Sequence, residues 1–200
     1  MLLKFFKIFF FISFLIFQSS VYSKNNNNEF NSKNLSNYFS AIVSYDNQKN
    51  ADSLKFFKSS KSLINRHDPF LKKYIFSLII EGEMNRAIHE LKHFSDKKSS
   101  DFFEAYLILM LDSIEKKDFK RSNRYLNELS KFKRNGTFEL IIYESLKNYN
   151  FLFENKRIPP NDSAFNNLSL ISMAFQSCYL GEKQTQSYFD NLINFTTEVV

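Results

Sequence analysis

The apolar side chains of this chain recur with the period of an α-helix. In the clearest stretch, apolar residues at offsets of 0, 3, 4, 7 and 10 share one helical face: Met84, Ala87, Ile88, Leu91 and Phe94. The spacing is similar in residues 54–64 and 119–129, and no stretch alternates as a half-buried strand would. Three glycines and three prolines in 200 residues are too few turn signals for a β-rich protein. The sequence therefore predicts an all-α protein.

Three segments of the chain repeat the same order of side chains. Each has a small residue four positions before a large apolar one, and the small residues are 34 and 35 positions apart. A polar turn precedes each segment, and a further apolar helix precedes each turn, at residues 37–45, 72–80 and 103–114. This spacing predicts a repeated pair of helices. The small and large residues are Ser53 with Phe57, Ala87 with Leu91, and Ser122 with Leu126.

On these residues the chain resembles tetratricopeptide-repeat proteins, whose unit of two antiparallel helices recurs about every 34 residues. In that family the small residue of the second helix lets the helices approach closely, and the bulky residue one turn later fills the gap. Ala41 matches the small position of the first helix, whereas Ile75 and Met110 replace it in the next two units. The resemblance implies a right-handed solenoid of about 4–5 antiparallel helix pairs. The chain is most similar to secreted members of the family from Gram-negative bacteria.

The repeat pattern divides the chain unevenly. Residues 34–132 are predicted to form three helix pairs, and residues 133–200 to form degenerate repeats. Within the second part we expect one long helix from residue 136 to 154 and a last pair over residues 163–180 and 184–195.

The first residues have the order of a secretory signal peptide. Lys4 and Lys7 precede an apolar run, and small residues lead to a predicted cut after Ser23, so that residues 1–23 would be removed on export. The alternative is an uncleaved membrane anchor, which would make the protein a membrane-tethered envelope assembly factor. Residues 24–33 are predicted to be a flexible leader. We expect the protein in the periplasm or associated with the cell envelope.

Charge and cysteine content exclude some functions. Without its signal peptide the chain would have an excess of only about four positive charges, too modest to predict a nucleic-acid partner. Its one cysteine, Cys178, cannot form a disulfide within the chain, and we expect it to be a small buried apolar residue.

The stretch His89-Glu90-Leu91-Lys92-His93 has the spacing of a zinc peptidase motif. At 100° per residue, however, His89 and His93 both point away from the core side on which Leu91 lies. No third ligand follows in a recognisable frame, and Lys92 adds a cation beside the histidines. We interpret the stretch as a solvated helix face and expect no catalysis, metal or cofactor. A secreted zinc metallopeptidase using His89, Glu90 and His93 is the alternative.

The function that the sequence favours is the binding of a partner molecule. In stacked helix pairs the first helices line the inner surface, where partners dock. We expect a protein or peptide partner there, although each residue could instead pack against a neighbouring repeat. The residues predicted to face the partner are Tyr38, Ile42, Tyr45, Lys72, Lys73, Phe76, Ile79, Leu107 and Leu111.

Overall fold

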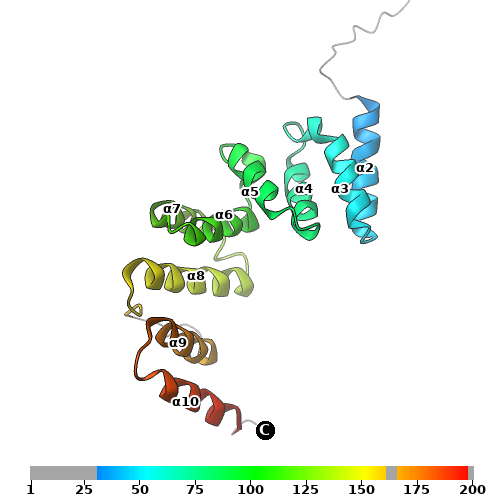
Figure 1. Cartoon of the computed structure of the whole chain (residues 1–200). Helices are drawn as coiled ribbons and strands as arrows, with labels where there is room; N and C mark the ends of the chain where they lie inside the picture. The colour runs from blue at the N-terminus through cyan, green and yellow to red at the C-terminus, as the bar shows by residue number, and fades with distance from the viewer. Residues whose placement is uncertain (1–30, 161–165, 198–200) are drawn as a thin grey trace, which may run out of the picture. The chain divides into compact units, whose positions relative to one another are not determined.

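The computed structural model describes residues 31–160 and 166–197, and every regular element in these residues is helical (Figure 1). The predicted signal peptide and the leader up to residue 30 lie outside the described residues. From Lys33 onward the chain forms one compact unit. Its elements are α2 (Ser32–Asp46), α3 (Asn50–Ser59), η1 (Lys61–Leu63), α4 (Asp68–Ile80), α5 (Met84–His93), η2 (Lys98–Ser100), α6 (Phe103–Glu115), α7 (Phe119–Leu129), α8 (Thr137–Asn155), α9 (Asn166–Leu180) and α10 (Thr185–Thr197). The prediction of an all-α protein is confirmed.

The helices coincide with the apolar segments of the sequence. The long helix predicted from residue 136 is α8, and the predicted last pair is α9 and α10. Pro69 lies in the first turn of α4, where its missing N–H has no helical partner to lose. His67 precedes that helix as its N-cap. The helices thus begin and end within a few residues of where the periodicity begins and ends.

Four turns between helices have the same backbone geometry. Each contains one residue in the left-handed region, with φ between 55° and 76°: Gln48, Gly82, Lys117 and Gly181. The N–H of the next residue donates to the carbonyl five positions earlier, as from Glu83 to Leu78 and from Asp118 to Ser113, both at 2.8 Å. This arrangement satisfies carbonyl groups at the end of the first helix. Glycine adopts the left-handed conformation freely, whereas Gln48 and Lys117 do so at a cost of about 1 kcal/mol.

Aromatic rings fill the core between α2, α3 and α4. Phe57, Phe70 and Tyr74 are fully buried. The Phe57 and Phe70 rings meet edge to face at 5.4 Å, and Tyr38 stacks on Phe70 at 5.6 Å. Each buried ring contributes about 1.5–3 kcal/mol relative to an exposed one. The same core continues through α5, α6 and α7 with Leu91, Met110 and Leu129.

The small residues that define the repeat are all fully buried, as are Ala41 and the two bulky partners Phe57 and Leu91. The Ser53 hydroxyl donates to the carbonyl oxygen of Ala41 at 3.0 Å, which joins α3 to α2. The Ser122 hydroxyl instead donates to Asn150 of α8. Leu126 is only half-buried, and Tyr125 and Leu129 are the large buried side chains of α7. The buried serine of α7 is therefore bonded to α8, whereas the buried serine of α3 is bonded to α2.

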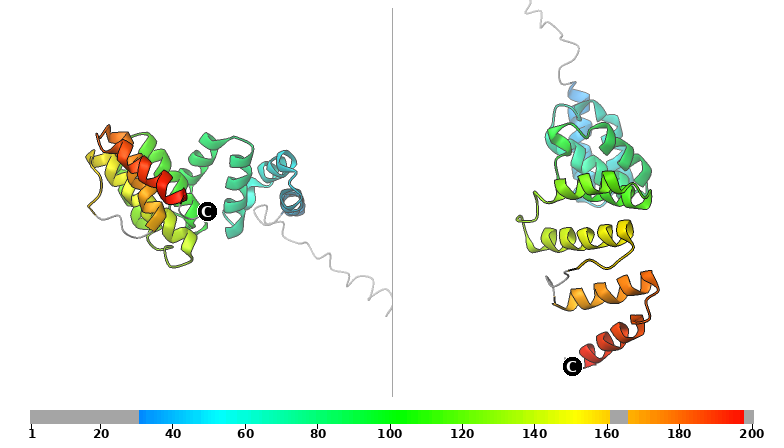
Figure 2. Two further views of the ribbon diagram at one scale, coloured as in Figure 1. Left: turned by 90° about the horizontal axis from the view of Figure 1, so that it is seen from below. Right: turned by 90° about the vertical axis from the view of Figure 1, so that its left-hand side faces the viewer.

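α8 and α9 bury a different kind of side chain. α8 contacts α6 and α7 on one side and α9 on the other (Figures 1 and 2). At these contacts the buried residues are mainly small or polar: Asn148, Asn150, Ser169, Ala174, Gln176 and Ser177. Cys178 is exposed, so the prediction that it is buried is wrong. It lies on α9, whose small and polar side chains face inward.

Candidate interaction surface

The histidine pair of the zinc-peptidase-like stretch lies on the surface of α5. His89 and His93 are both exposed, which confirms their predicted orientation. Glu90 between them is only 4% exposed, and its Oε1 is 2.5 Å from the Nζ of Lys61 at the start of η1. In the part of the chain that the structure describes, no three His, Cys, Asp or Glu side chains gather as metal ligands would. The Glu90 carboxylate is thus engaged in joining α5 to η1.

Tyr38, the first residue predicted to face a partner, lies in the core. It is only 7% exposed, and its hydroxyl is 2.8 Å from the Nε2 of His67. Burial raises the pKa of the Tyr38 hydroxyl, in keeping with a site closed to water. The residue packs α2 onto α3 and α4 and presents little surface to a partner.

The other predicted residues lie nearer the surface. Leu111 is 49% exposed. The rest are half-buried: Ile42, Tyr45, Lys72, Lys73, Phe76, Ile79 and Leu107.

Two lysines of α4 join this helix to α6 and to α2. The Nζ of Lys72 is 3.0 Å from both carboxylate oxygens of Glu104 in α6, and it lies over the rings of Phe76 and Phe102. The Nζ of Lys73 is 3.8 Å from a carboxylate oxygen of Asp46 in α2. Both lysines thus have carboxylate partners within the chain, so the surface around them has little net charge of its own.

The three helices joined by these ion pairs, α2, α4 and α6, each carry apolar side chains near the paired residues. On α2, Phe39 and Val43 precede Asp46 at helical spacing and are 58% and 61% exposed. On α4 and α6, Phe76 and Leu111 lie one or two turns after Lys72 and Glu104. We define the first-helix surface as Phe39, Val43, Asp46, Lys72, Lys73, Phe76, Glu104, Leu107 and Leu111. Sequence reasoning missed Phe39 and Val43, which follow the predicted Tyr38 and Ile42 by one position on a helix with apolar residues on several sides.

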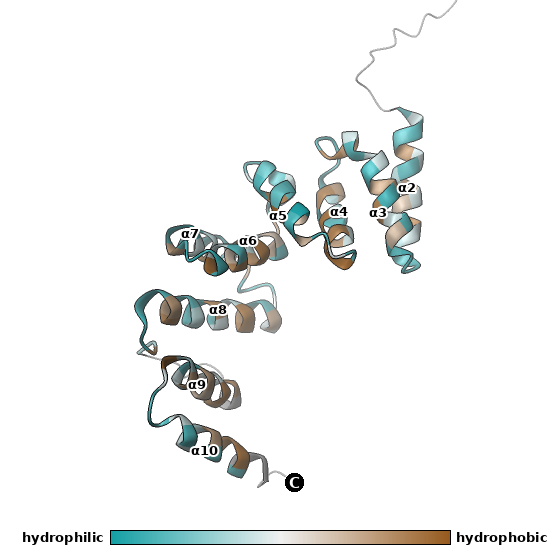
Figure 3. Cartoon of the chain, viewed as in Figure 1, coloured by the Kyte–Doolittle hydropathy of each residue, from teal (hydrophilic) through white to brown (hydrophobic). Residues whose placement is uncertain are grey.

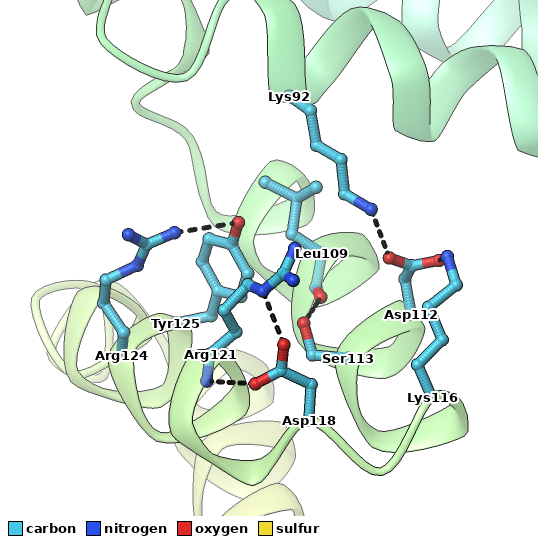
Figure 4. A network of polar contacts seen from close by, with 9 residues as sticks. All are labelled: Lys92, Leu109, Asp112, Ser113, Lys116, Asp118, Arg121, Arg124 and Tyr125. Carbon is cyan, nitrogen blue, oxygen red and sulfur yellow. Dashed lines mark hydrogen bonds and ion pairs between the residues drawn. The ribbon is translucent and has the colours of Figure 1, made fainter.

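A separate polar network joins α5 to the turn between α6 and α7 (Figure 4). Asp112, 5% exposed, accepts hydrogen bonds from Lys92 at 2.6 Å and from Lys116. Burial acts to raise the pKa of Asp112, but the hydrogen bonds from the two lysines outweigh it and lower the pKa overall. Nearby, Asp118 caps α7 by accepting from the backbone N–H of Arg121 at 3.0 Å. The contacts of Asp112 thus join α6 to α5, and those of Asp118 fix the start of α7.

Comparison with known proteins identifies no relative of this chain. The chain matches no protein-family model, no curated protein and no solved structure. In the part of the chain that the structure describes, no helix is both long enough and apolar enough to cross a membrane.

Proposed function

We propose that the protein is a non-catalytic helical-repeat scaffold of the cell envelope, which binds a protein or peptide on the first-helix surface. The observation that carries this proposal is the position of the exposed large apolar side chains. Of the eleven among the described residues, Phe39, Val43 and Leu111 lie on this surface, and none lies on α3 or α7. Large apolar side chains that are exposed together on one surface commonly mark a site of interaction with another protein.

The repeated turns support a solenoid of antiparallel pairs. The left-handed residues Gln48, Gly82 and Lys117 follow one another at the spacing of the small residues, and Gly181 repeats the geometry between α9 and α10. Four helix pairs result, with α8 between the third and the fourth. In such a solenoid the first helices line the inner surface. The first-helix surface would therefore face a bound chain.

Partner binding would depend on a few apolar anchors. Phe39, Val43 and Leu111 are exposed and can each lose a large apolar area to a partner. The lysines and carboxylates between them are already paired, so they favour a partner with little charge at its centre. We do not propose the metallopeptidase, because the Glu90 carboxylate is bonded to Lys61 and the exposed histidines lack a third ligand among the described residues.

Site-specific photocrosslinking in cells tests this proposal. A photoreactive phenylalanine analogue replaces Phe39 or Leu111 and, as matched controls on outer helices, exposed Lys55 of α3 or Asn127 of α7. We expect one discrete adduct from the two first-helix positions and none from the controls. Adducts of equal yield from Lys55 and Asn127 would contradict the proposal.

Measurement of binding to the purified partner is the second part of the test. The adduct identifies the partner, which is purified and titrated against the wild type and the Phe39→Asp/Leu111→Asp variant. Replacing two interface anchors should weaken binding by at least about 100-fold. The Lys55→Asp/Asn127→Asp variant should bind like the wild type. Equal binding by all three proteins would show that the first-helix surface is not the binding site.

A further inference from the structure

The second helix of the third pair, α7, and its two flanking turns contain a cluster of positive charge. Residues 115–134 contain eight lysines and arginines against three carboxylates, whereas the formal net charge of all 200 residues is +6. All eight cationic side chains are exposed: Lys116, Lys117, Lys120, Arg121, Arg124, Lys131, Lys133 and Arg134. We call them the α7 basic surface.

Three of these cations, Lys120, Arg121 and Arg124, lie on α7 itself, and the others lie in the turns on either side of it. Lys120 and Arg124 are four residues apart, which places them on one face of the helix. The buried residues Ser122, Tyr125 and Leu129 occupy another face. A hollow of about 480 Å³ is bordered by the three cations of the helix, Lys120, Arg121 and Arg124, and by Asp118.

The chain neutralises only part of this charge. Asp118 pairs with Arg121 at 2.5 Å, Glu128 pairs with Lys131, and Asp112 of α6 pairs with Lys116. The ion pairs of the described residues include none of Lys117, Lys120, Arg124, Lys133 or Arg134. Several cations are therefore held close together at a cost in mutual repulsion that a bound anion would relieve.

The repeat does not require all of these cations. In the repeat register, Lys120 corresponds to Ala51 of α3 and Asn85 of α5, whereas Arg121 corresponds to Asp52 of α3 and to Arg86 of α5. All three helices nevertheless bury the small residue of the repeat: Ser53, Ala87 and Ser122. The packing of the helix pair therefore does not require the excess of positive charge on α7. A role other than packing accounts for it.

We propose that the α7 basic surface binds the anionic headgroups of a lipid bilayer. A protein interface needs an apolar centre, and none of the large apolar side chains exposed in the described residues lies on α7. A plane of headgroups needs only cations, each of which strengthens binding by about fivefold in affinity. α7 also exposes no aromatic ring for stacking on nucleic-acid bases. The first-helix surface lies on other helices, so membrane and partner would be bound by different helices.

Vesicle co-sedimentation of the full chain tests the proposal. Vesicles of pure phosphatidylcholine are compared with vesicles containing about 30% phosphatidylglycerol. The readout is the increase in binding that the anionic lipid adds, because an apolar amino-terminal segment would insert into both kinds of vesicle. The test variant is Lys117→Glu/Lys120→Glu/Arg134→Glu. The matched control, Lys49→Glu/Lys55→Glu/Lys98→Glu, changes the net charge equally at exposed lysines elsewhere. Circular dichroism melting checks that both variants are folded.

The expected result is a gain in wild-type binding on anionic vesicles that falls steeply as salt rises above about 0.1 M. The test variant should lose at least about 100-fold in affinity, since each reversed charge removes more than one fivefold increment. The control should change by less than about tenfold. Equal losses in the two variants would overturn the proposal, and so would an absence of any gain on anionic vesicles. Binding of a duplex oligonucleotide without vesicle binding would overturn it as well.

Discussion

The helices of residues 32–129 and those of residues 137–155 and 166–197 bury different kinds of side chain. In the first region the buried residues are mostly large and apolar, such as Phe57, Tyr74 and Leu91. In the second region α9 buries Ala174, Gln176 and Ser177. The same helix exposes a stripe of four large apolar residues at helical spacing: Leu168, Ile171, Phe175 and Tyr179.

This difference shows that apolar content alone does not decide what a helix buries. The ribbon of α9 is largely apolar and that of α7 largely polar (Figure 3). Nevertheless α7 packs by large buried side chains and α9 by small and polar ones. Small side chains let neighbouring helices approach closely but remove little apolar area from water. We therefore expect the stability of the described fold to depend mainly on residues 32–129.

The largest expected effect is in the apolar core of the first region. Leu91→Ala removes a fully buried side chain of α5 and should lower the free energy of unfolding by about 2–5 kcal/mol through the cavity that it leaves. Urea denaturation measures the change. The matched control Leu111→Ala alters the same side chain at an exposed position and should cost far less. Equal costs at the two positions would contradict the packing of α5.

A smaller effect is expected where the two regions meet. Asn150 of α8 accepts a hydrogen bond from Ser122 and donates one to Asn123 at 2.6 Å. Asn150→Ala leaves the buried Ser122 hydroxyl without its acceptor and should cost about 1–3 kcal/mol. In a double-mutant cycle measured by urea denaturation, Ser122→Ala should recover part of that loss. Strict additivity of the two changes would show that this bond does not couple α7 to α8.

The Asp112 network should give the first region a dependence on pH. The pKa of Asp112 is lower in the folded protein than in the unfolded chain, so its stabilising effect is present above the unfolded pKa of about 4 and is lost as pH falls through the folded pKa. Asp112→Asn should cost about 1–2 kcal/mol at pH 7, a moderate value because Lys92 and Lys116 remain partly in water. The gap between the variant and the wild type in thermal or urea unfolding should narrow at acidic pH. A constant gap between pH 7 and acid would contradict this role.

The smallest effect is expected on the exposed stripe of α9. Ile171→Ser removes an apolar side chain that is 41% exposed and should change the free energy of unfolding by less than about 0.5 kcal/mol. Differential scanning calorimetry of the variant checks this value. Leu152→Ala of α8, where the side chain is fully buried, should cost several times more and provides the matched control within the same region. A large loss from Ile171→Ser would show that the stripe is covered in solution.

Much of the fold could be predicted from the sequence because helical periodicity is a local property. The spacing of apolar residues placed α4 to α7, the long helix α8 and the pair α9 and α10. The outward direction of His89 and His93 followed from the same angles. The signal peptide, the partner and the absence of catalysis stay predictions.

The candidate surface was less predictable because it depends on contacts between helices. Tyr38 and Phe39 are adjacent residues on an apolar helix, and only the positions of α3 and α4 make the first a core residue and the second an exposed one. Leu126 and Tyr125 differ in burial for the same reason.

The sequence by itself determined that the chain is helical, where most helices begin and end, and which small residues come close to a neighbouring helix. These features follow from backbone hydrogen bonding and from side-chain spacing within a few residues. Only the tertiary structure decided that Glu90 is buried against Lys61 and that α9 turns its apolar stripe outward. Those outcomes depend on which helices are near enough to exclude water from one side of a residue, and no local pattern encodes that distance.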